Sequence, residues 1–125
     1  MCVQAGFYRS EYISARDGTK KYMAVTQFEA TDCRRAVPCV DEPAAKATFL
    51  VTLVCQPDVK AISNMPVVRA ETLFITEDEQ RQDQQACRGL VVPKGWVRYH
   101  YAESPIMSTY LLAFVVSGST RQAAG

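Results

Sequence analysis

Residues 27–43, called the motif block below, constrain the fold more than any other part of this chain. The block combines a glutamate near its start with two arginines, two cysteines, two prolines and a closing Asp-Glu pair. A regular strand would alternate apolar and polar residues, and a regular helix would not carry Pro38 in its middle. We therefore expect an irregular segment with one short helical turn over residues 32–36, which Thr31 or Asp32 could cap.

The residues on either side of the motif block have the pattern of β-strands. Residues 46–56 alternate, and one face carries an apolar set: Ala47, Phe49, Val51, Leu53 and Cys55. This period of two predicts a strand with one buried face. Residues 109–116 are apolar on both faces, which predicts a central strand covered on both sides. The other strand candidates are residues 6–12, 21–28, 61–68, 71–76 and 97–101, with turns at Asp17-Gly18 and at residues 56–58.

These patterns predict an all-β fold, and the chain also resembles a known family. The motif block and the flanking residues 6–12, 46–54, 63–65 and 105–116 resemble the N-terminal domain of zinc aminopeptidases of the aminopeptidase N family, nearest to the puromycin-sensitive branch. The resemblance implies an antiparallel, saddle-like or sandwich domain over residues 1–116, incomplete because some opening strands would precede Met1. Residues 77–95 are polar and rich in glutamine, so we expect an exposed loop there, longer than the connection in the family. The small, polar residues 117–125 are expected to form a disordered tail, where the family would continue with an ordered segment.

The resemblance further implies a substrate-binding pair. Glu29 would reach the active site of the intact enzyme and pair with the free α-ammonium group of a peptide, and Gln27 would support the same pocket. A carboxylate at a fixed place recognises the cation that only a chain terminus carries. The alternatives are a partly exposed glutamate at a strand end and a glutamine packed in a sheet. We expect both arginines of the block, Arg34 and Arg35, to pair with nearby carboxylates, for which the candidates are Asp32, Asp41 and Glu42.

The zinc chemistry of this family cannot be placed on the chain, which has a single histidine, His100. Such a zinc site needs two histidines at i and i+4 on a helix, with a glutamate as general base. We therefore expect no catalytic residue, metal ligand or cofactor in this chain, although the intact family holds zinc, and we expect His100 to be a strand residue. By resemblance the chain is part of an enzyme that removes N-terminal amino acids from peptides, inactive when alone. The alternatives are a non-catalytic interaction module or modulator of a full-length aminopeptidase, and a truncated product without selected function.

Composition limits the partners and the compartment. A net charge of +1 over 125 residues gives no reason to expect nucleic acid or an anionic membrane as partner. The longest apolar run, residues 110–116, is too short to span a bilayer. Five cysteines, an odd number, favour reduced thiols in a cytoplasmic protein, with a Cys33–Cys39 disulfide as a lesser alternative.

We expect a peptide N-terminus as partner in the intact enzyme, and a full-length aminopeptidase or self-association for this chain alone. Two observations lead to the second expectation. An apolar strand over residues 109–116 needs cover on both faces. In addition, Val37 and Val40 stand where the family has aromatic residues, which leaves the core short of apolar volume.

Overall fold

The computed structural model describes residues 4–73 and 95–118, and these residues form an all-β structure. The only helical elements in these two ranges are two single 3-10 turns, η1 (Cys33–Arg35) and η2 (Thr109–Leu111). The strands are β1 (Gly6–Ile13), β2 (Lys20–Gln27), β3 (Thr52–Cys55), β4 (Val59–Ser63), β5 (Val67–Thr72), β6 (Val97–Tyr101) and β7 (Phe114–Gly118). The all-β expectation is therefore confirmed.

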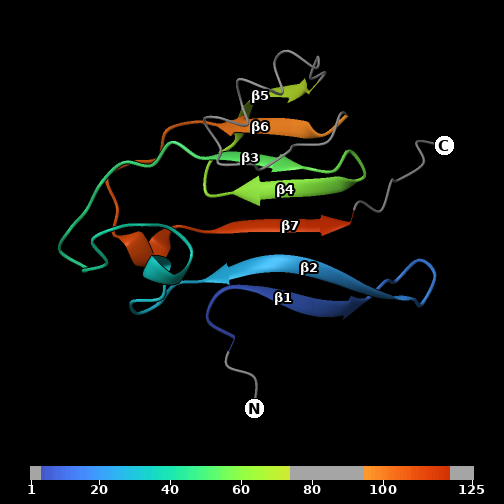
Figure 1. Ribbon diagram of the computed structural model, residues 1–125, viewed down its shortest axis with the longest axis horizontal. Coiled ribbons are helices and arrows are strands. Elements are labelled where there is room, and N and C mark those ends of the chain that lie inside the picture. Colours follow the sequence, from blue (N-terminus) through green and yellow to red (C-terminus); the bar gives the residue numbers. More distant parts are fainter. Residues whose placement is uncertain (1–3, 74–94, 119–125) are drawn as a thin grey trace, which may run out of the picture.

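The strands form two antiparallel sheets. One has four strands in the order β1-β2-β7-β4, and the other has three in the order β3-β6-β5. Figure 1 shows the strands side by side, with β3 next to β4, so the two sheets follow one another as a single extended layer. This arrangement is one layer of strands rather than a stacked sandwich.

The hairpin between β1 and β2 turns where the sequence predicts it. The Asp17 carboxylate accepts hydrogen bonds from the backbone N–H of Thr19 at 3.1 Å and from its hydroxyl at 2.7 Å. These hydrogen bonds lower the pKa of Asp17 to about 2, and the bond from the Thr19 hydroxyl has the largest effect. Gly18 follows with φ of 66°, a left-handed conformation that glycine adopts without steric cost.

The long strand expected over residues 46–56 is shorter than predicted, because only Thr52–Cys55 joins a sheet. Residues 47–51 make separate hydrogen bonds to an irregular partner instead. Ala47 forms an isolated bridge with Met107, and the N–H of Phe49 donates to the hydroxyl of Ser104 at 2.8 Å. The alternation of buried and exposed positions continues without a ladder, except that Ala47 is exposed.

Two other strand boundaries also differ from the expectation. Residues 61–68 are divided between β4 and β5, because Asn64 turns the chain. Its side chain donates to the carbonyl of Leu111 at 2.8 Å and accepts from the N–H of Ala113 at 2.9 Å. Of the strand expected over residues 71–76, only the first two residues lie in β5, and residues 74–76 lie outside the described residues.

The strand expected over residues 109–116 begins with the 3-10 turn η2 and becomes β7 only at Phe114. Its central position is confirmed, since β7 lies between β2 and β4. The expected cover on both faces is not found among the described residues, because every residue of β7 is only half-buried. The strand continues to Gly118, so the first two residues of the expected tail belong to β7. The rest of that tail, and the expected insertion up to residue 94, lie outside the described residues.

The core lies at one end of the four-stranded sheet, beneath the motif block. Its buried members are Phe28, Cys33 and Leu112. Partly buried residues pack around them: Ala36, Val37, Cys39, Phe49, Val51, Met107 and Phe114. Val40 is 67% exposed, so the expectation that its small size removes core volume is wrong for this position.

Candidate functional site

The motif block leaves the sheet at the end of β2 and folds back over the core. Phe28 is 2% exposed, and its ring meets the ring of Phe114 edge-on at 6.0 Å. The chain then turns through a cis peptide between Glu29 and Ala30 and enters η1. This turn confirms the short helix expected over residues 32–36. Asp32 is the N-cap residue, but its side chain makes no capping hydrogen bond, so that part of the expectation is wrong.

Gln27 and Glu29, the two expected substrate-binding residues, are exposed on either side of the buried Phe28. Gln27 is the last residue of β2 and pairs in register with Gly6. Glu29 forms no ion pair with any residue that the structure describes. The buried phenyl ring therefore fixes the local backbone while the two polar side chains face outward, free to contact a ligand or another part of a larger protein.

Asp41 fixes the far end of the motif block. Its carboxylate, of which 1% is exposed, accepts hydrogen bonds from the backbone N–H of Arg34 at 3.1 Å and from the hydroxyl of Thr109 at 2.6 Å. The Thr109 hydrogen bond is the main reason that the pKa of Asp41 lies below its ordinary value. The Arg34 guanidinium also donates to the carbonyl of Asp41 at 3.0 Å. This Asp41 cluster (Asp41, Arg34 and Thr109) ties the block to the segment that leads into β7.

The second arginine is structural as well. Arg35 Nε lies 3.0 Å from a carboxylate oxygen of Asp32, which confirms the expected pairing of both arginines with local carboxylates. The stem of Arg35 also explains a glycine at the start of β1. A Cβ on Gly6 would lie 3.1 Å from Arg35 Cβ, and the φ of Gly6 is 72°. Of the paired acidic residues, Asp41 is buried and Glu42 is exposed, so they do not share a site.

The cysteines of the block are free thiols. Cys33 is fully buried, and burial raises the pKa of its thiol to about 12, with smaller contributions from the neighbouring Cys39 and Asp41. A thiol with so high a pKa is a poor nucleophile, since the thiolate is the reactive form. Cys33 is therefore a packing residue and not a reactive thiol.

A polar cluster on the three-stranded sheet was not expected from the sequence. The Glu71 carboxylate lies 2.9 Å from His100 Nε2, 3.3 Å from Arg98 and 3.7 Å from Arg69. The contact with His100 is the largest cause of a lowered pKa at Glu71. The residues come from β5 and β6, and only the strand register brings them together. His100 is a strand residue, as expected.

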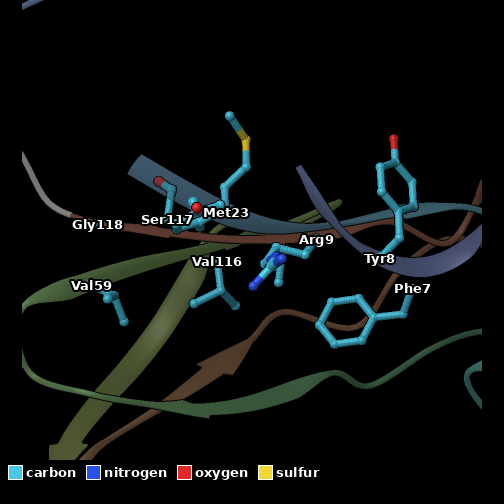
Figure 2. A pocket seen from close by; sticks show the side chains of 10 residues that line it. Phe7, Tyr8, Arg9, Met23, Val59, Val116, Ser117 and Gly118 are labelled. Carbon is cyan, nitrogen blue, oxygen red and sulfur yellow. The ribbon is translucent and has the colours of Figure 1, made fainter. Parts of the chain in front are cut away.

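The four-stranded sheet carries a shallow apolar hollow on one face. Figure 2 shows Phe7 and Val116 on the side of this hollow, whereas Tyr8 and Met23 project from the opposite side of the sheet. The guanidinium of Arg9 lies 4.6 Å from the centre of the Tyr22 ring, which also lines the hollow. A second apolar hollow lies beside Val37, where the family resemblance expects a larger aromatic residue.

Within the described residues no three metal-ligating side chains gather in one place. The Nε2 atom of His100 lies beside Glu71 and Arg69, which are not a zinc ligand set. The zinc that the family resemblance implies therefore does not fit these residues. No helix in the described parts is long and apolar enough to cross a bilayer.

Comparison with known proteins agrees with this geometry. The model of the peptidase M1 N-terminal domain matches residues 3–111, and the chain belongs to this family. It is 40% identical over 116 residues to aminopeptidase N of Bos taurus and 46% identical over 111 residues to aminopeptidase M1 of Arabidopsis thaliana. It is 44% identical over 113 residues to the alanine/arginine aminopeptidase of Saccharomyces cerevisiae. These matches cover 93%, 89% and 90% of this chain but only 10%, 10% and 11% of the relatives, so the chain spans about a tenth of their length.

Proposed function

We propose that this chain acts as the part of a zinc aminopeptidase that binds the N-terminus of a peptide substrate, while the metal and the catalytic groups belong to other parts of the enzyme. On its own the chain would not hydrolyse peptides. The observation that supports this proposal is the arrangement around Phe28, whose buried ring holds Gln27 and Glu29 outward on a fixed backbone.

The roles of the two residues follow from their chemistry. The Glu29 carboxylate would accept charge-assisted hydrogen bonds from the α-ammonium group of the peptide, and the Gln27 amide would supply a neutral partner beside it. A carboxylate so placed selects free N-termini, because an acylated terminus has no charge and fewer donors. In water a single such contact is weak, so the selectivity would arise once the rest of the enzyme encloses the site.

The compartment proposed is the cytoplasm. Cys33, Cys39 and Cys55 are free thiols, and a protein with unpaired cysteines suits a reducing compartment.

A chimera tests the role of Glu29. This chain replaces the matching segment of the Saccharomyces cerevisiae alanine/arginine aminopeptidase, with which it is 44% identical. In an active chimera, Glu29→Gln should lower kcat/KM for substrates with a free amine by about tenfold to a hundredfold, the loss expected for one charge-assisted hydrogen bond. Its preference for free over N-acetylated substrates should fall in parallel.

The matched control is Glu42→Gln, since Glu42 is an exposed glutamate of the same block. It should leave both the rate and the preference unchanged. Equal effects of the two substitutions would show that Glu29 is a surface carboxylate without a role in substrate binding.

A further inference from the structure

Strand β1 forms a regular outer edge of the structure. It pairs with β2 over its whole length, from Gly6 opposite Gln27 to Ile13 opposite Lys20. No described strand lies on its other side, and Figure 1 shows it as the lowest strand of the layer. The opposite outer strand, β5, is interrupted by a register shift near Arg69. A regular edge strand offers unpaired N–H and C=O groups to another strand.

The sequence of β1 is self-complementary about Ser10. Arg9 and Glu11 flank the serine with opposite charges, and Tyr8 and Tyr12 follow as an aromatic pair. Phe7 and Ile13 complete the set. If two copies of β1 meet antiparallel around a two-fold axis at Ser10, Arg9 lies opposite Glu11 of the other copy. In the same way Tyr8 lies opposite Tyr12, and Phe7 lies opposite Ile13, each pair on one side of the sheet. Such aromatic, aromatic–aliphatic and opposite-charge pairs are the favourable cross-strand pairs of antiparallel sheets.

The side chains concerned are accessible. Phe7 is 49% exposed and Ile13 is 66% exposed, so both can contact a second copy. Glu11 is bound to Lys20 at 2.9 Å, but half of its side chain is in solvent. An exposed ion pair of this kind contributes little and leaves the carboxylate available to a second cation.

We propose that two copies of this chain associate through β1, antiparallel about a two-fold axis at Ser10, so that their four-stranded sheets become one continuous sheet. Charge sets the register. An axis at Arg9 would place two arginines opposite each other, and an axis at Glu11 would place two glutamates opposite each other, and like charges in these positions oppose pairing. Only the axis at Ser10 puts each Arg9 opposite the Glu11 of the other copy.

Sedimentation velocity of the 125-residue chain over a range of concentrations tests this proposal. The unsubstituted chain should form dimers. Arg9→Glu leaves only glutamates at the two charged positions, and Glu11→Arg leaves only arginines. Each should raise the dimer dissociation constant by about tenfold or more, because two attractive pairs become repulsive. Far-UV circular dichroism checks that both variants keep their β structure.

Two rescues separate the proposal from simple loss of folding. The double variant R9E/E11R restores opposite charges across the axis and should dimerise again. An equimolar mixture of the two single variants should form a heterodimer, because every glutamate then faces an arginine. Lys60→Glu, at an exposed position of β4, is the control and should leave dimerisation unchanged.

Three results would overturn the proposal. The first is an unsubstituted chain that stays monomeric at every concentration reached. The second is dimerisation that does not depend on the charge at residues 9 and 11, which would mean that another surface associates. The third is a mixture of the two single variants that does not pair although each variant is folded.

Discussion

Replacement of Phe28 by alanine tests whether the core beneath the motif block stabilises the whole structure. Phe28 is 2% exposed, so almost its entire side chain leaves water on folding. A buried phenylalanine removes about 150–250 Å² from solvent, worth about 4–6 kcal/mol at the usual coefficient per unit area. Measured losses for such truncations are about 3–5 kcal/mol, and we expect Phe28→Ala to lower the free energy of unfolding by this amount.

Phe7→Ala provides a matched control. Both rings contact Phe114, Phe7 at 5.3 Å and Phe28 at 6.0 Å between ring centres, so each substitution removes one aromatic pair. Phe7, however, is 49% exposed. About half of the area is then already in water and no closed cavity forms, so the expected loss is about 2–3 kcal/mol.

Urea denaturation at low protein concentration measures both losses. Trp96 is the single tryptophan and directly precedes β6, so its fluorescence reports on the three-stranded sheet. Circular dichroism reports on both sheets. Coincident transitions would indicate one cooperative unit. Equal losses for the two variants, or a loss below about 1 kcal/mol for Phe28→Ala, would refute the assignment of the core to this region.

Three further substitutions have definite expected outcomes. Thr109→Val should destabilise the chain near neutral pH and destabilise it less in acid. The folded-state pKa of Asp41 is lowered, so its carboxylate adds stability above the unfolded pKa, and this stability is lost as the pH falls through the folded pKa. Urea midpoints that fall equally at all pH values would contradict this expectation. In thermal melts, Gly6→Ala should lower the free energy of unfolding more than Gly18→Ala does. Both glycines have positive φ, but only Gly6 is crowded by another side chain. Equal losses of about 1–2 kcal/mol would mean that the crowding relaxes. Tyr101→Phe should leave the free energy of unfolding unchanged or raise it by up to about 1 kcal/mol, since the buried hydroxyl has no hydrogen-bond partner among the described residues. A clear loss of stability in the same melts would show that the hydroxyl has a partner.

Local pattern predicted the elements whose partners are close in sequence. The β1–β2 hairpin follows from two alternating runs and a turn that Asp17 and Gly18 specify by themselves. The short turn in the motif block and its arginine pairs depend on residues within seven positions of one another. These features are fixed by geometry that a single short segment contains.

The errors arise where the partner is distant. Residues 46–51 have the alternation of a strand, but they lie beside an irregular segment around Met107 and therefore gain no ladder. The apolar pattern predicts a strand from Thr109 onward, whereas this residue begins a 3-10 turn and its hydroxyl binds Asp41, 68 positions earlier in the chain. No property of either residue indicates that contact. Gln27 and Glu29 are exposed. Their part in substrate binding stays a prediction, because exposure alone does not show what a side chain contacts.

The place of β7 has a consequence for how the chain folds. The last strand of the described structure lies between β2 and β4, and a hydrogen bond from Phe114 to Thr26 closes a separation of 88 residues. During synthesis, β2 and β4 each have one edge without a hydrogen-bonded neighbour until β7, which ends at residue 118, is available. Non-local pairing of this kind slows folding, because loop closure must precede the contacts that stabilise it. The interval before β7 arrives is therefore when the nascent chain is most exposed to misassembly and most dependent on chaperones.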